Sequence, residues 1–178
     1  MRRRSVAGLV TLLFLASARN AAAQSTAEDG PAALGKTIYF GVAGGGSISG
    51  APGVAATGIL AIEWRRSVLS AEVGVGETFS GWDRFSAGAQ AGVFLLPDAN
   101  APYLLAGVEQ GTFVDIVNEK RGRTDFALTL EGGYALRQSN GGRQLWFGAR
   151  GMIPIVSHVY TAAAPQFPVV QFMAKLLL

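Results

Sequence analysis

The stretch Phe-Ala-Leu-Thr-Leu-Glu-Gly-Gly-Tyr-Ala-Leu-Arg at residues 126–137 alternates large apolar side chains with small or polar ones. Successive side chains of a β-strand point to opposite faces, so this alternation predicts a strand with one apolar and one polar face. Glu131 lies on the polar parity, and no charged residue interrupts the apolar one. A strand of this kind separates an apolar environment from a polar one.

The same two-residue period recurs along the chain, between clusters of Gly, Pro, Asn and Asp. The predicted strands cover residues 36–48, 57–65, 67–78, 84–96, 102–113, 125–137, 143–154 and 168–178. One parity is apolar throughout, whereas the other carries small residues and a few charges of both signs. Because a soluble barrel would carry charge all over its outer face, the apolar parity favours contact with lipid. A sheet in lipid must close, since open edges would leave backbone groups unpaired. We therefore expect an all-β, eight-stranded antiparallel up-and-down transmembrane β-barrel.

The connections between these strands alternate in length. Residues 65–66, 97–101 and 139–142 form short links, and the links between them are mostly longer, as expected for periplasmic turns and extracellular loops. Aromatic residues gather toward the strand ends, where we expect two interfacial girdles. One comprises Tyr39, Trp64, Phe94, Tyr103 and Trp146 near the short links, and the other comprises Phe79, Trp82, Phe85, Phe113 and Phe126.

The first residues predict a targeting segment. Three arginines at positions 2–4, an apolar stretch at 6–18 and Ala21-Ala22-Ala23 are typical of a secretory signal peptide, which we assign to residues 1–23. Residues 24–34 are a short periplasmic lead-in, and residues 35–178 form the barrel. Without the four arginines of residues 1–23, the 15 basic residues fall to 11 against 12 acidic ones. That balance gives no support for binding nucleic acid.

Taken together, the cleavable signal, the eight alternating strands, the Ser139-Asn140-Gly141-Gly142 turn and the C-terminal strand resemble the small outer-membrane β-barrel proteins of the OmpA/OmpX type. The resemblance spans residues 35–178. It implies a monomer in the bacterial outer membrane that contacts outer-membrane lipid and lipopolysaccharide and is inserted by the barrel assembly machinery. No cofactor is expected. The absence of cysteine and the single histidine also give no support for a metal site.

Several charged residues lie on the inward parity. An unpaired charge in a narrow lumen costs several kcal/mol, so we expect these residues to form a charge network that plugs the barrel. The network comprises Glu63, Glu72, Glu109, Glu131, Arg150 and Lys175, with Gln90, Gln171 and Arg137 beside it. A structural plug is favoured because eight strands leave room only for side chains, and an open porin is not expected. The alternative for the same residues is a gated or leaky path for small ions.

Outside the barrel wall, residues 115–123 are the most charged segment. Lys120, Arg121 and Arg123 are candidates for contacting phosphates of lipopolysaccharide or an external partner, and the alternative is a solvated loop. The apolar segment 161–167 either folds over the barrel mouth or reaches toward a partner.

His158 is the single histidine and follows Ser157 directly. On a strand these neighbours point to opposite faces and cannot share a proton, so no catalysis is expected. The sequence thus predicts a structural or surface-interaction role in the outer membrane. Two alternatives remain. One is an outer-membrane lipid-modifying enzyme, similar to a lipid A deacylase, that uses His158. The other is a soluble periplasmic, lipocalin-like ligand-binding barrel.

Overall fold

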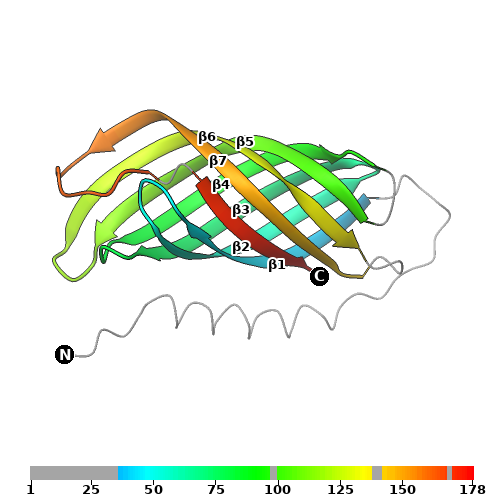
Figure 1. Ribbon diagram of the computed structural model, residues 1–178, viewed down its shortest axis with the longest axis horizontal. Coiled ribbons are helices and arrows are strands. Elements are labelled where there is room, and N and C mark those ends of the chain that lie inside the picture. The colour runs from blue at the N-terminus through cyan, green and yellow to red at the C-terminus, as the bar shows by residue number, and fades with distance from the viewer. Residues whose placement is uncertain (1–35, 97–99, 138–141, 168–169) are drawn as a thin grey trace.

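The computed structural model describes residues 36–96, 100–137, 142–167 and 170–178, so the predicted signal peptide and lead-in lie outside the described residues. Its eight strands are β1 (Lys36–Ser47), β2 (Gly53–Trp64), β3 (Ser67–Thr78), β4 (Asp83–Phe94), β5 (Asn100–Asp115), β6 (Lys120–Arg137), β7 (Gln144–Val159) and β8 (Val170–Leu177). Each strand pairs antiparallel with the next, and β1 pairs with β8 (Figure 1). The predicted eight-stranded up-and-down barrel is confirmed. None of the described residues belongs to a helix long and apolar enough to cross a membrane.

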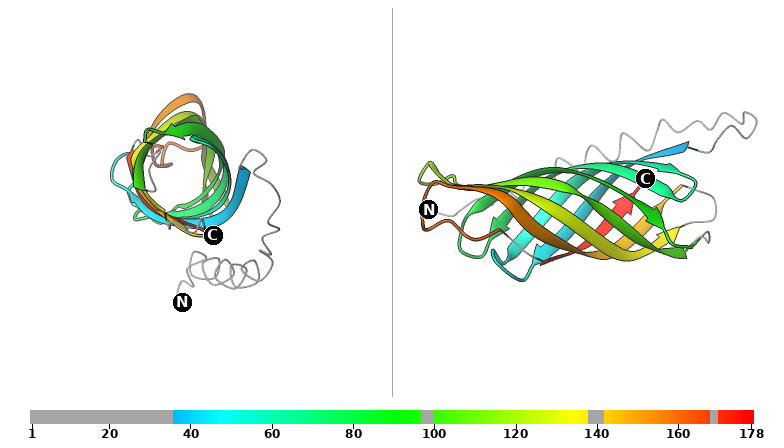
Figure 2. Two further views of the ribbon diagram at one scale, coloured as in Figure 1. Left: turned by 90° about the vertical axis from the view of Figure 1, so that its right-hand side faces the viewer. Right: turned by 90° about the horizontal axis from the view of Figure 1, so that it is seen from above.

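Closure depends on a short seam. β1 and β8 pair from Gly41 opposite Leu177 to Ser47 opposite Gln171, whereas β5 and β6 pair over the whole length of β5. The end-on view in Figure 2 shows the strands forming one continuous ring. Because every strand has two neighbours, the barrel has no edge strand, although individual strands project beyond their neighbours.

The barrel has two distinct ends. We call the end with connections 65–66, 95–99 and 138–143 the turn end, and the end with connections 48–52, 79–82, 116–119 and 160–169 the loop end. The predicted alternation of short and long links is wrong except at 160–169, because β2, β6 and β7 extend into the segments expected to be loops. Residues 120–124 have no apolar parity, yet their backbone pairs with β5 and Thr124 shares a hydrogen bond with Thr112. Hydrogen bonding along the ladder thus continues a strand where the hydrophobic pattern has ended.

The two faces of the wall follow the predicted parity. Exposed large apolar side chains include Phe40, Leu69, Leu130 and Phe172 on the outward parity. The inward parity holds the buried polar residues, among them Glu72, Gln90, Glu109, Thr129, Glu131, Arg150, Gln171 and Lys175. The barrel is therefore apolar outside and largely polar at the centre of its interior.

The expected turn-side girdle is mostly wrong. Tyr39, Phe94, Tyr103 and Trp146 are buried inside the barrel, and only Trp64 of that group faces outward. The four residues lie on the inward parity of their strands. Parity therefore predicts the direction of these side chains better than their position near a strand end does. On the loop side, Phe79, Phe85 and Phe126 are exposed, whereas Phe113 is fully buried and Trp82 packs against the interior.

Paired glycines make room for one of these aromatic rings. Gly133 of β6 lies opposite Gly148 of β7, and a Cβ atom built on either residue would collide with the Tyr103 hydroxyl group. By contrast, a Cβ atom on Gly44 meets nothing within 4 Å. The Gly133–Gly148 pair is thus required by packing inside the barrel, whereas Gly44 is not.

We expect Gly148→Ala to lower the free energy of unfolding by about 1–3 kcal/mol, because the new methyl group displaces the buried Tyr103 ring. Gly44→Ala is the matched control and should change it by less than about 0.5 kcal/mol. Urea unfolding in detergent micelles, followed by tryptophan fluorescence, measures both. Equal effects of the two substitutions would contradict the packing of Tyr103 against β6 and β7.

Candidate functional site in the barrel lumen

The middle of the lumen is organised around the Arg150 guanidinium group. Its Nη2 atom donates to Glu72 at 2.6 Å, to Gln90 at 2.9 Å and to Glu131 at 2.7 Å. Its Nη1 atom donates to Glu109 at 3.1 Å, and its Nε atom donates to Glu131 at 2.9 Å. One cation on β7 therefore contacts side chains from β3, β4, β5 and β6.

Lys175, on β8, is the second cation among the charged side chains in the middle of the lumen. Its ammonium group donates to Glu72 at 3.0 Å and lies 2.8 Å from a carboxylate oxygen of Glu131. Lys175 and Glu131 are both almost fully buried. β8 is thereby connected through the lumen to β3 and β6, neither of which is its neighbour in the wall.

Arg84 is a third cation, which the sequence analysis did not single out. It is buried on β4 and pairs with Glu109 of β5. Its position two residues before Ser86, on the inward parity of β4, was the available signal. With Arg84, the middle layer contains three carboxylates (Glu72, Glu109 and Glu131) and three cations (Arg84, Arg150 and Lys175). The cluster is neutral as a whole, which a poorly hydrated interior requires.

Glu63 does not belong to this cluster. It lies near the turn end, where it pairs with Arg137 and accepts a hydrogen bond of 2.9 Å from Gln144. The structure thus brings together five of the six residues expected in the lumen network and places Glu63 in a separate rim pair. The guanidinium group of Arg137 also lies over the Phe94 ring, 3.6 Å from its centroid.

An aromatic layer separates the rim pair from the charged cluster. The Trp146 ring meets Phe94 edge-on at 5.3 Å between centroids and lies 4.7 Å from Tyr103. Tyr103 donates a hydrogen bond to Glu131 at 2.9 Å, and the Trp146 indole donates to Gln144 at 2.7 Å. The layer is therefore hydrogen-bonded on both sides and closes the turn end of the lumen.

A second apolar layer closes the loop end. Phe167, from the connection between β7 and β8, is buried beside Phe113 with a centroid distance of 6.5 Å. The Arg84 guanidinium carbon lies 5.0 Å from the Phe167 ring centroid, and Met152 belongs to the same cluster. Within segment 161–167, Phe167 inserts into the barrel mouth, whereas Ala162, Ala163 and Gln166 are exposed.

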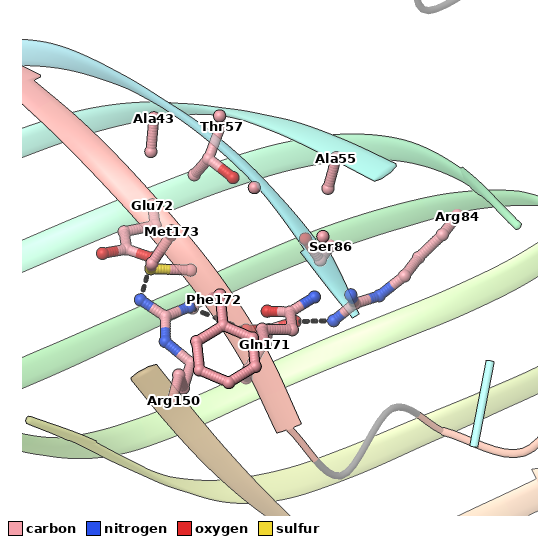
Figure 3. A pocket seen from close by; sticks show the side chains of 15 residues that line it. Ala43, Ala55, Thr57, Glu72, Arg84, Ser86, Arg150, Gln171, Phe172 and Met173 are labelled. Carbon is pink, nitrogen blue, oxygen red and sulfur yellow. Dashed lines mark hydrogen bonds and ion pairs between the residues drawn. The ribbon is translucent and has the colours of Figure 1, made fainter. Parts of the chain in front are cut away.

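One cavity in the lumen is small. A cavity of about 20 Å³ lies between the charged cluster and the wall formed by β1 and β2. Figure 3 shows Ala43, Ala55 and Thr57 on one side of it and Arg150, Gln171 and Arg84 on the other. This volume holds roughly one water molecule.

The three basic residues of the charged surface segment have different environments. Arg123 donates to the buried Asp125 at 2.7 Å and to Ser157 at 3.0 Å, so it is bound to the barrel. The Arg121 guanidinium carbon lies 4.6 Å from the Tyr160 ring centroid, and Lys120 is exposed. In the adjoining turn, hydrogen bonds from Asn118 hold the pKa of Asp115 below its ordinary value. Only Lys120 and Arg121 are thus available to an external phosphate.

Ser157 and His158 do not form a catalytic pair in the structure. The Ser157 hydroxyl group donates to Asp125, and His158 lies opposite Thr124 on the other face of β7. Within the described ranges, no three His, Cys, Asp or Glu side chains are grouped so that they could hold a metal ion.

Comparisons with known proteins support the fold. No protein-family model matches the chain, and no curated protein matches its sequence. The crystal structure of Neisserial surface protein A is similar, with a TM-score of 0.61 and 13% identity over 81% of this chain and 98% of that one. A de novo designed transmembrane β-barrel gives a TM-score of 0.44 at 16% identity, over 80% of this chain and 95% of that one. At 13% identity, the likeness to Neisserial surface protein A is one of fold.

We expect Glu131→Gln to lower the free energy of unfolding by about 3–5 kcal/mol, because Arg150 and Lys175 then lose a shared carboxylate inside the lumen. The exposed Glu119→Gln is the control, with an expected change of less than about 0.5 kcal/mol. Adding Lys175→Met to Glu131→Gln removes one charge of each sign and should restore part of the loss. Denaturant unfolding measures all three variants, and a Glu131→Gln variant as stable as Glu119→Gln would contradict the network.

Proposed function

We propose that this protein is a small bacterial outer-membrane barrel with a structural or surface-interaction role, whose lumen is closed to ions. The observation that carries the proposal is the combination of an apolar exterior with a lumen filled by three successive layers. Leu130 and Phe172 are 57% and 51% exposed in mid-strand. Exposing apolar side chains over a whole barrel surface is unfavourable in water but favourable in lipid. The closed sheet leaves no edge strand exposed to hydrocarbon.

The layered lumen argues against a pore. An ion entering from the turn end meets Phe94, Tyr103 and Trp146, and one entering from the loop end meets Phe113 and Phe167. Between them, each carboxylate of the charged cluster is already paired with a cation. We therefore favour a plug over the ion path that the same charged residues would otherwise allow.

The remaining parts of the proposal follow from the same location. The turn end faces the periplasm, residues 1–23 are removed as a signal peptide, and the barrel assembly machinery inserts a monomer. Lys120 and Arg121 extend from the loop end, where lipopolysaccharide phosphates lie within their reach. No catalysis is proposed, since Ser157 pairs with Asp125 instead of a histidine.

The decisive experiment fractionates cells and compares the gel mobility of the membrane fraction in SDS before and after heating. A closed lipid-embedded barrel resists SDS until it is heated, because all its backbone pairs must break together. Planar-bilayer recordings of the same protein should show no stepwise conductance. Recovery in the soluble periplasmic fraction would overturn the membrane location, and reproducible open-channel steps would overturn the closed lumen.

We expect Leu130→Arg to lower the free energy of unfolding in phospholipid vesicles by about 2–4 kcal/mol, because the guanidinium group would lie in hydrocarbon. Ile116→Arg, at the exposed tip of the β5–β6 connection, is the control and should change it by less than about 0.5 kcal/mol. Guanidinium unfolding followed by tryptophan fluorescence measures both. If the outer face met water instead of lipid, the two substitutions would be equally mild, and that result would contradict the membrane location.

A further inference from the structure

Charge is distributed unequally between the two ends of the barrel. The described residues of the turn end include five cations (Lys36, Arg65, Arg66, Arg137 and Arg143) and one carboxylate (Glu63). Those of the loop end include five carboxylates (Glu77, Asp83, Asp115, Glu119 and Asp125) and three cations (Lys120, Arg121 and Arg123). Outside the described residues, the sequence adds Asp98 between β4 and β5, and Glu28 and Asp29 in the predicted lead-in before β1, so the turn end has five cations against four acidic side chains.

Most of the turn-end cations are not used by the fold. Arg137 pairs with Glu63, but the side chains of Lys36, Arg65, Arg66 and Arg143 are exposed. None of these four makes an ion pair with another described residue. The part of the chain that the structure describes thus supplies no counter-charge for them.

Two of these four cations, Lys36 and Arg65, flank one tryptophan, and Arg66 follows in the same turn. Lys36 of β1 lies directly opposite Trp64 of β2, and Arg65-Arg66 is the turn that follows. Trp64 is 42% exposed on the outward parity, and the Arg65 guanidinium carbon lies 5.4 Å from its ring centroid. Directly opposed residues have Cβ atoms about 5 Å apart, so Lys36 flanks the same indole. We call Lys36, Trp64, Arg65 and Arg66 together the basic corner.

The backbone of the turn gives an independent indication. Arg65 has a φ of 57°, in the left-handed region where Gly and Asn are favoured. The described residues offer no carboxylate partner that would explain an arginine at this strained position. The contact that the described residues show for its side chain is with Trp64, on the surface that continues into the apolar wall.

We propose that the basic corner binds the phosphate group of an anionic phospholipid at the membrane boundary of the turn end. This inference rests on the membrane location proposed above. Tryptophan is favoured at the membrane–water interface, where its ring contacts the glycerol and acyl groups of lipids. Cations beside such a tryptophan lie at the level of the lipid phosphates. A lipid with a phosphate headgroup and an acyl chain matches both parts of the corner. A free phosphate ion would use the cations but not the outward-facing indole.

The test uses Trp64 as its own reporter. A Trp82→Phe background leaves Trp64 and Trp146, and Trp146 is buried in the lumen, beyond direct contact with lipid. The protein is folded into phosphatidylcholine vesicles that contain the same minor fraction of either brominated phosphatidylglycerol or brominated phosphatidylcholine. We expect the anionic lipid to quench the fluorescence more strongly, with a relative association constant of about fivefold or more. Salt should reduce this preference.

The variants separate binding from folding. Arg65→Asn removes the charge but suits the left-handed backbone, so it should fold at least as well as the parent and lose part of the preference. The triple variant Lys36→Gln/Arg65→Asn/Arg66→Gln should quench equally with both lipids. Arg143→Gln is the matched control, because the β6–β7 turn lies on the opposite side of the same rim. It should retain the preference.

Two results would overturn the basic corner while leaving the barrel intact. One is equal quenching by both lipids in a parent protein that still shows the heat-dependent gel shift. The other is an equal loss of preference in Arg143→Gln and in the triple variant, which would assign the effect to general positive charge. A protein that neither inserts into vesicles nor shows the gel shift would overturn the proposed membrane location itself.

Discussion

The structure depends on the pairing of charge inside a narrow closed barrel. Arg150 contacts three carboxylates at once, and removing any of these contacts would leave a charge in a space with room for about one water molecule. Other side chains in the lumen complete this charge pairing. Arg84 and Lys175 make the cluster neutral, and the aromatic layer donates one further hydrogen bond to it through Tyr103. Six of the eight strands contribute to the cluster.

This arrangement divides the molecule along its axis into parts with different tasks. The charged cluster connects strands from β3 to β8 through the lumen, and an aromatic layer lies on either side of it. Phe167 is unusual among these residues because it comes from a connection and not from the wall. The loop end is thus closed by a segment that follows β7, whereas the turn end is closed by side chains of the strands themselves.

Most of the fold was predictable from the sequence, because a period of two over eight segments determines both the strands and their faces. The same parity would have placed Arg84 and the four inward aromatic residues correctly, had it been applied to every large side chain. Other features leave no such signal. The continuation of β6 from Lys120 depends on backbone pairing with β5, and burial of Phe167 depends on space left by Gly111, where a Cβ atom would collide with its ring. The partners of each lumen charge also required the register, since sequence indicates which charges face inward but not which of them meet.

The short seam between β1 and β8 has a consequence for the order of folding. Strands β1 and β2 contribute nothing to the charged cluster, and residues 37–62 contain no charged side chain. Among the described residues, no side-chain hydrogen bond or ion pair joins β1 to β8, so their ladder must hold the seam through backbone groups and apolar contacts. β1 and β8 are also the paired strands most distant in sequence, so the entropy cost of bringing them together is the largest for any pair in the barrel. The lumen charges can assemble across β3 to β8 before the ring is complete, so loop entropy favours joining of the first strand to the last as the final step of assembly.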